Sequence, residues 1–383
     1  MKKQDKNIGN FPNRLPKLRF MGFEGEWNFK YGNEIFDNIS NKKHNSDLPI
    51  LAITQDYGAI PRDLIDFKIT VTDKSVENYK VVEVGDFIIS LRSFQGGIEF
   101  SEYKGICSPA YIILRPIISI DRIFFKYYLK TPKYITHLNR KLEGIRDGKM
   151  ISYSYFSDII LPLPSIEEQN KVSGFLALIE SRIETQKKII EQLETLMKAN
   201  RENIFSQKLR FKDEHGSDFP AWERKKIKEI LTIGSGKDYK HLNYGAIPVY
   251  GTGGVITFVD SFLYDGETVC IGRKGTIDKP LYFNGKIWTV DTLFYTHSFN
   301  NSVPKFVFNI FQNINWKEYN EASGVPSLSK NTIEKIVISI PCVEEQTKIA
   351  KFLSSVQEKI ETEKQILEKL ELQKKFLLAN LFV

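Results

Sequence analysis

The sequence predicts an α+β protein in which two β-rich globular blocks alternate with two long helices that pair antiparallel. Residues 159–205 recur as residues 336–382 at a constant offset of 177, without a gap. Each copy opens with a β-branched run that ends at proline, as a short strand does, and continues with helical apolar spacing. A chain that carries one segment twice is expected to perform one task twice.

The repeated segments predict a coiled-coil pair. An S-x-x-E capping box at Ser165 and Glu168 starts the first helix, and Cys342 at the equivalent cap predicts a weaker start for the second. Apolar residues then recur alternately every four and three positions in both copies. The one interior seam position that is polar in both copies holds Gln186 and Glu363. These midpoints meet in an antiparallel pair, so we expect them to fix the helix register; a solvent-facing position in an imperfect seam is the alternative.

A second repeat indicates how the chain is laid out. Lys-Leu-Arg-Phe occurs at residues 17–20 and again at 208–211, just after the first long helix. This circular order places the termini close in space, as pseudo-twofold symmetry requires. The expected division is a basic leader at 1–16, for which disorder is left open, a first globular domain at 17–164, a central helix at 165–207, a second globular domain at 208–341 and a C-terminal helix at 342–383.

Composition sets the outer limits. A chain of 383 residues with 42% hydrophobic and 13% aromatic content excludes a disordered protein. No apolar stretch approaches the roughly 18 residues of a membrane span, and the first residues lack the hydrophobic core of a signal peptide. Three scattered cysteines without metal spacing fit a reducing compartment. We therefore expect a cytoplasmic protein with no membrane segment, no disulfide and no metal.

The distribution of charge indicates an acidic partner only in particular stretches of the sequence. The net charge of +7 depends largely on the first 20 residues, which carry six basic residues and one acid. A further stretch, residues 126–149, has seven basic residues and two acids interleaved with Tyr127, Tyr128 and Tyr134. Basic side chains suit phosphates and aromatic ones suit bases, so this stretch favours a DNA groove. An exposed helix with a solvated basic face explains it equally well.

Catalytic motifs are missing from the sequence. Gly-Ser-Gly-Lys at residues 234–237 lacks the leading glycine and the hydroxyl residue of a phosphate loop, and the five histidines have no neighbour at metal spacing. No tetrapeptide of amino-methylating enzymes and no nuclease pattern is evident. These absences favour a binding protein over an enzyme.

The arrangement resembles the DNA-specificity subunit of type I restriction-modification systems. Both globular blocks end in a P-x-x-E-E-Q junction, at residues 164–169 and 341–346, and residues 247–250 and 288–295 are similar to one class of its target recognition domains. The resemblance covers residues 17–382 and implies that each block reads one half of an asymmetric, split target in double-stranded DNA. Helices of about 40 residues, at ~1.5 Å per residue, would set an unread gap of roughly 60 Å.

The resemblance also implies partners. Two methyltransferase subunits and restriction/translocase subunits would join this non-catalytic chain, and S-adenosylmethionine, ATP and Mg would be bound by those partners. The assembled complex would be an adenine-N6 DNA methyltransferase and an ATP-dependent type I site-specific deoxyribonuclease.

Recognition residues are expected in matching loops of the two blocks, because loops held on a sheet commonly carry binding side chains. For any one of these loops, a surface loop without a ligand remains an alternative. The whole chain has two alternative interpretations. One is a coiled-coil adaptor that presents two modules that do not bind DNA, and the other is a solitary nuclease. The expected DNA contacts are Arg92, Gln95, Arg146, Lys149, Tyr250, Arg273, Lys274 and Lys330.

Overall fold

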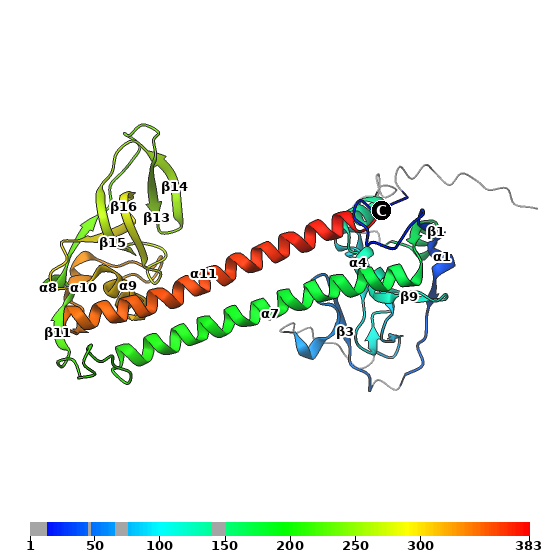
Figure 1. The fold of residues 1–383 in the computed structure, drawn as a ribbon, viewed down its shortest axis with the longest axis horizontal. Helices are drawn as coiled ribbons and strands as arrows, with labels where there is room; N and C mark the ends of the chain where they lie inside the picture. Colours follow the sequence, from blue (N-terminus) through cyan, green and yellow to red (C-terminus); the bar gives the residue numbers. More distant parts are fainter. Residues whose placement is uncertain (1–13, 45–46, 66–75, 140–150) are drawn as a thin grey trace, which may run out of the picture. The chain divides into compact units, whose positions relative to one another are not determined.

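Two long helices, α7 (Ile166–Phe205) and α11 (Val343–Asn380), contribute to both compact units of the chain (Figure 1). The computed structural model describes residues 14–44, 47–65, 76–139 and 151–383. Unit 1 comprises Met1–Thr185 and Leu367–Val383, and unit 2 comprises Gln186–Ile366. Each unit contains part of both helices together with its own sheets, which confirms the α+β class. The five-segment functional division stays a prediction.

The two helices run antiparallel. In unit 1 the Lys374 ammonium of α11 donates to Glu180 of α7 at 2.7 Å, and in unit 2 Lys364 pairs with Glu194 at 2.8 Å. A later position in α7 therefore meets an earlier one in α11. The apolar seam is buried, as the alternating spacing requires. Its buried members include Val172, Leu176, Ile179, Ile183, Ile190, Met197, Ile349, Leu353, Ile360 and Leu370.

Gln186 and Glu363 meet within this seam, and both are buried. The Gln186 amide donates to the Glu363 main-chain carbonyl at 3.1 Å and also to its carboxylate. The Lys359 ammonium, one turn earlier, and then the Gln186 amide lower the pKa of the Glu363 carboxyl. The expected contact is thus present, whereas its role in fixing the register stays a prediction.

The Lys-Leu-Arg-Phe repeat has a clear structural purpose. Its arginine makes a two-pronged bond with a buried glutamate in the first turn of a long helix: Arg19 with Glu168 at 2.8 and 2.8 Å, and Arg210 with Glu345 at 3.1 and 2.7 Å. The predicted capping box is therefore only half right. Ser165 does accept the Glu168 amide at 3.3 Å, but the Glu168 carboxylate serves the arginine instead of the helix terminus.

The glutamine of each E-E-Q motif joins the long helix to a second helix. In unit 1 the Gln169 side chain donates to the Pro164 carbonyl and accepts the Asp121 amide, immediately before α4 (Arg122–Tyr128). In unit 2 Gln346 donates to the Pro341 carbonyl and accepts the Val303 amide, immediately before α9 (Pro304–Asn313). Both motifs therefore work as junctions between elements of one unit.

Unit 1 is built from small antiparallel sheets around an aromatic core. Rings of Phe36, Phe87, Phe125 and Phe156 meet edge to face, and Phe382 from beyond α11 packs against Phe124. Strand pairs are β1 (Asn28–Tyr31) with β10 (Ile160–Leu163), β3 (Leu51–Thr54) with β4 (Gly58–Pro61), and β5 (Lys80–Val82) with β8 (Gly105–Cys107); the four-stranded sheet has the order β2 (Phe36–Ile39), β9 (Ile112–Pro116), β6 (Phe87–Ile89), β7 (Glu99–Phe100). Short helices are α1 (Gly32–Ile35), η1 (Arg62–Leu64), α3 (Ser93–Gly96), α5 (Pro132–Asn139) and α6 (Tyr153–Ser157).

Unit 2 is organised by one larger sheet. Gly266 and Glu267 do not form a turn, because both residues lie inside a long strand that pairs with its neighbour through this point. The sheet order is β12 (Thr232–Ser235), β17 (Leu293–His297), β15 (Tyr264–Gly272), β16 (Leu281–Thr289), β13 (Ile247–Gly251), β14 (Gly254–Val259), and only β13 and β16 pair in parallel. Strand β11 (Glu223–Lys226) pairs with β18 (Val337–Ile340), and the short helices are α8 (Ile227–Ile230), η2 (Trp316–Tyr319) and α10 (Lys330–Lys335).

Replacing Glu345 with glutamine should lower the free energy of unfolding of unit 2 by about 2 to 3 kcal/mol, because Arg210 loses its charged partner. Urea denaturation followed by tryptophan fluorescence measures this, since three of the four tryptophans lie in unit 2. The exposed neighbour Glu344 provides the matched control, Glu344→Gln. Equal stability of the two variants would mean that the buried pair contributes nothing.

Replacing Gln186 with leucine should destabilise the helix pair by about 1 kcal/mol, because the buried Glu363 loses a hydrogen-bond donor. The double variant Gln186→Leu/Glu363→Leu should recover that loss and admit slipped registers. Chemical denaturation and disulfide trapping between engineered cysteine pairs on α7 and α11 report the two effects. A double variant that traps only the native pair would contradict the register role.

Candidate nucleic-acid interface

A tight turn after β15 carries two exposed basic residues of unit 2. Arg273 and Lys274 follow Gly272, where a Cβ atom would lie 2.0 Å from the Thr276 carbonyl, and precede Gly275, which has a φ of +86°. Neither position accepts an L side chain without strain. The Arg273 amide donates to the Thr292 carbonyl at 2.8 Å, which joins the turn to the loop before β17.

Backbone hydrogen bonds join this turn to a second predicted loop. The Gly275 amide donates to the Pro326 carbonyl at 2.9 Å, and the Leu328 amide donates to the Arg273 carbonyl at 2.9 Å. A cavity of about 310 Å³ lies between the two loops. The structure thus brings together three predicted residues, Arg273, Lys274 and Lys330, which all line this cavity.

The cavity wall is basic, and contacts within unit 2 hold its loops in place. The Arg273 guanidinium lies over the buried Phe294 ring, 5.9 Å from its centroid, and no ion pair within the described residues involves Arg273 or Lys274. Lys330 lies 3.6 Å from Glu334 in a half-exposed i,i+4 pair, which holds it only weakly. The Glu321 carboxylate accepts hydrogen bonds from the Ser329 and Thr332 hydroxyls. These bonds lower the pKa of the Glu321 carboxyl, and the bond from Thr332 has the largest effect.

Tyr250 lies on β13 and does not line the cavity of the basic residues. Its ring packs against Phe283, with 4.1 Å between centroids, and burial raises the pKa of its hydroxyl. Ser235 was missed by the sequence reasoning, although it lines the cavity beside Arg273. It belongs to the Gly-Ser-Gly-Lys segment, which was considered only as a phosphate loop, so its glycine-polar composition was the available signal.

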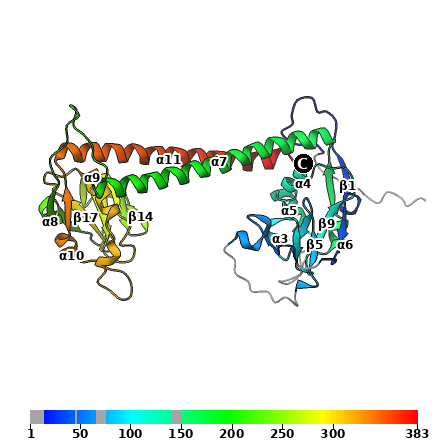
Figure 2. The same cartoon turned by 90° about the horizontal axis from the view of Figure 1, so that it is seen from below.

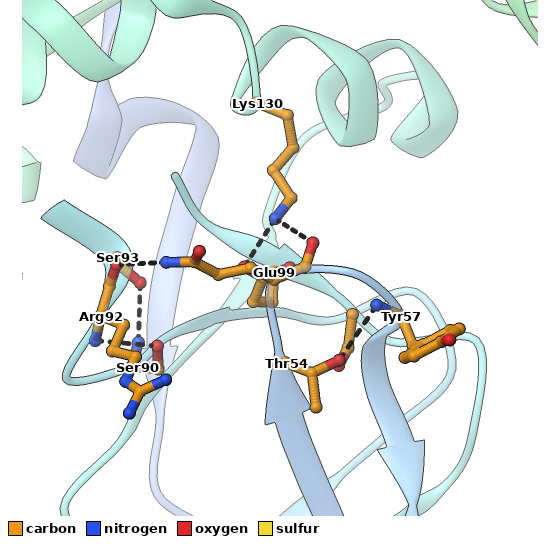
Figure 3. A network of polar contacts seen from close by, with 9 residues as sticks. Thr54, Tyr57, Ser90, Arg92, Ser93, Glu99 and Lys130 are labelled. Carbon is orange, nitrogen blue, oxygen red and sulfur yellow. Dashed lines mark hydrogen bonds and ion pairs between the residues drawn. The ribbon is translucent and has the colours of Figure 1, made fainter. Parts of the chain in front are cut away.

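The corresponding loop of unit 1 presents Arg92 and Gln95 on exposed positions. Ser90 and Ser93 fix the loop, because the Ser90 amide donates to the Ser93 hydroxyl at 2.8 Å and the Arg92 amide to the Ser90 hydroxyl at 3.3 Å (Figure 3). The Gln55 amide also donates to the Arg92 carbonyl at 3.4 Å. The backbone is therefore held while both side chains stay accessible.

Exposed apolar residues stand next to Arg92 and Gln95 in the sequence. Leu91 is 53% exposed and Phe94 is 37% exposed, and the Asn139 amide of α5 fixes the Phe94 carbonyl at 2.6 Å. Helices α3 and α5 lie side by side (Figure 2). This loop offers one cation, one amide and two apolar contacts, so its chemistry differs from that of the basic turn in unit 2.

The expectation for residues 126–149 is wrong in its aromatic part. Tyr127, Tyr128 and Tyr134 are buried on the inner faces of α4 and α5, where they cannot stack on bases. Lys126 and Lys130 form ion pairs with Glu102 and Glu99. The predicted contacts Arg146 and Lys149 lie outside the described residues.

Two further observations concern the described residues alone. Their histidine, cysteine and acidic side chains form no group of three or more that could hold a metal ion. Within the same ranges, no helix has the length and apolar character needed to cross a membrane.

Comparisons with known proteins give one consistent family. The model of the Type I restriction modification DNA specificity domain matches residues 221–372. The MjaVIII type I restriction enzyme specificity subunit of Methanocaldococcus jannaschii is 28% identical over 185 residues, which are 46% of this chain and 41% of that protein. A putative specificity subunit of Haemophilus influenzae is 25% identical over 116 residues, 29% of this chain and 30% of that protein. The matched regions thus span less than half of these curated relatives.

Solved structures agree over nearly the whole chain. The type I S subunit from M. genitalium covers 96% of this chain and 99% of its own length, with a TM-score of 0.60 and 18% identity. A chain solved in work on complex assembly and conformational transition of the type I R-M system covers 93% of this chain and 97% of its own length, with a TM-score of 0.58 and 14% identity. Residues 221–372 therefore match the type I restriction modification DNA specificity domain, and the chain as a whole has the fold of the S subunits of type I restriction-modification systems.

Proposed function

We propose that this chain is the DNA sequence-recognition subunit of a type I restriction-modification complex. The globular segments 17–164 and 208–341 each read one half of an asymmetric, bipartite target, and α7 and α11 set the unread gap between the halves. The observation that carries the proposal is the pair of loops in unit 2 that present Arg273, Lys274 and Lys330 around one cavity, within the matched specificity domain.

The side chains suit distinct parts of DNA. An arginine in a fixed turn makes two parallel hydrogen bonds to guanine in the major groove, and lysines neutralise phosphates. In unit 1 the exposed amide of Gln95 suits adenine, and exposed Leu91 and Phe94 suit the thymine methyl group. The two blocks thus have different chemistry, which supports two different half-targets.

Partner subunits supply the chemistry in this proposal. The chain itself is non-catalytic, and two methyltransferase subunits dock on it with restriction/translocase subunits. Those partners bind S-adenosylmethionine, ATP and Mg, and the complex methylates adenine N6 and cleaves DNA with ATP. A cytoplasmic location follows from such a substrate. Methylome sequencing of cells that express the intact system, with and without this chain, tests the proposal: methylation that persists without the chain would overturn it.

Replacing Arg273 with alanine should reduce the free energy of DNA binding by about 1 to 3 kcal/mol and relax the sequence preference at one base position. Replacing Lys274 with alanine should weaken the binding of all DNA sequences evenly and reduce the slope of log affinity against log salt concentration by about one. Fluorescence anisotropy with the assembled methyltransferase complex measures both across a salt series. Lys228→Ala is the matched control, because Lys228 is exposed on α8 and does not line the cavity. Unchanged binding by both test variants would contradict the interface.

The gap should follow helix length. Four residues inserted after Gln186, with four inserted after Glu363 to keep the antiparallel pairing, add ~6 Å to the helix pair. Because DNA rises ~3.4 Å per base pair, the half-targets should move apart by one or two base pairs with unaltered sequences. A methylation map of the variant shows the outcome. Altered half-target bases with an unchanged gap would mean that the helices read DNA.

A further inference from the structure

The hairpin of β13 and β14 exposes apolar side chains at the edge of the large sheet of unit 2 (Figure 1). On its outer strand β14, Val255 is 51% exposed and Ile256 is 50% exposed. No charged residue occurs from residue 245 to residue 259. An uncharged apolar edge tends to associate with other molecules, and an exposed apolar patch commonly marks an interaction site. We therefore expect another molecule to cover this strand.

A β-bulge explains why two consecutive residues of β14 are exposed. Side chains of a regular strand alternate between its two faces. The pairing register shifts between Val249 and Tyr250, which leaves Ile256 without a partner on β13. A Cβ atom on Gly251 would lie 2.9 Å from Cδ1 of Ile256, so this side chain packs against the β13 backbone close to the tip. Bulges commonly redirect side chains in this way at functional sites.

The tip of the hairpin adjoins the basic turn that follows β15. A Cβ atom on Gly275 of that turn would lie 3.6 Å from the Thr252 hydroxyl oxygen at the tip. Cβ atoms on Gly253 and Gly254 would meet no atom beyond their chain neighbours within 4 Å. The tip is therefore narrow and unobstructed, and glycines of this kind allow a backbone to approach a ligand closely.

The loop before β17 joins the tip to the turn. Its Val290 amide donates to the Tyr250 carbonyl of β13 at 3.0 Å. Two residues later, the Thr292 carbonyl accepts the Arg273 amide at 2.8 Å. The apolar strand and the basic turn are therefore neighbours that main-chain hydrogen bonds hold in one arrangement.

The combination of apolar and basic groups favours DNA over a protein as the covering molecule. Arg273 and Lys274 form no ion pair with any described residue, so the surface beside the hairpin needs an anion. Val255 and Ile256 cannot form side-chain hydrogen bonds, and the apolar group that DNA offers in the major groove is the 5-methyl group of thymine. A single DNA half-target supplies both the anion and the methyl group.

Unit 1 offers the same chemical combination through a different element. There the exposed Leu91 and Phe94 stand next to Arg92 in one loop. In unit 2 the cations come from the turn after β15 and the apolar residues come from a separate hairpin. Each unit thus places apolar contacts beside an exposed arginine.

We propose that Val255 and Ile256 contact the 5-methyl group of a thymine in the half-target that unit 2 reads. The thymine belongs to either strand and lies close to the base that Arg273 contacts. This inference rests on the proposed function and adds a base to it, because it requires an A·T pair in the half-target of unit 2.

Binding of the assembled methyltransferase complex to duplexes with the mapped target tests the proposal. Each thymidine of both half-targets is replaced in turn with deoxyuridine, which lacks only the methyl group. Loss of one buried methyl contact should weaken binding about fourfold at one position. The double variant Val255→Ala/Ile256→Ala should bind the thymidine duplex about fourfold more weakly, or worse, and should no longer distinguish deoxyuridine at that position.

Phe262→Ala is the matched control, because Phe262 is also exposed and apolar but lies beyond the other end of β14. It should keep the full effect of deoxyuridine. The substitutions in DNA use the unaltered protein, so the test does not depend on the folding of a variant.

The proposal is overturned if no deoxyuridine weakens binding, or if the double variant keeps every deoxyuridine effect. It is also overturned if the double variant loses affinity for the methyltransferase subunits while deoxyuridine has no effect, because the hairpin then contacts protein. Specific binding of the mapped target without any deoxyuridine effect removes this proposal alone. A complex that does not distinguish the mapped target from a scrambled duplex would contradict the proposed function as well.

Discussion

The buried ion pair at the first turn of each long helix is the interaction on which both units depend. Glu168 and Glu345 are 3% and 0% exposed, and an unpaired carboxylate at such depth is strongly unfavourable. Arg19 and Arg210 satisfy them with two bonds each, and the next residue, Gln169 or Gln346, fixes the start of a neighbouring helix. One short motif therefore joins a distant arginine segment, a long helix and a globular helix in each unit.

Sequence periodicity was sufficient for the long helices and for the contact between Gln186 and Glu363, because a heptad seam and a constant offset depend only on spacing. It could not reveal the partner of Glu168, since the arginine lies 149 residues away and S-x-x-E also signals a capping box. Tyr127, Tyr128 and Tyr134 were misjudged for a related reason. The amino-acid sequence shows that aromatic and basic residues are interleaved, whereas only the fold decides which helix face is buried.

The loops of the candidate interface show the same division. Arg273, Lys274 and Lys330 were predicted from two loops far apart in sequence, and backbone hydrogen bonds join those loops. Ser235 was not predicted, because its position opposite Phe294 results from the pairing of β12 with β17, which the sequence alone does not show. Tyr250 was selected by its loop, yet its ring belongs to a sheet contact with Phe283. Loop composition thus indicates where recognition occurs, and tertiary pairing decides which side chains take part.

The hydrogen bond from the Leu18 amide to the Asn380 carbonyl has a consequence for biosynthesis. Unit 1 needs Leu367–Val383 to complete its core, where Phe382 packs against Phe124, whereas unit 2 is one continuous segment, Gln186–Ile366. A ribosome therefore releases every residue of unit 2 before unit 1 has its last helix. Contacts between residues so distant in sequence form slowly, and a growing chain folds its continuous parts first. The half that is translated earlier is consequently the half that matures later.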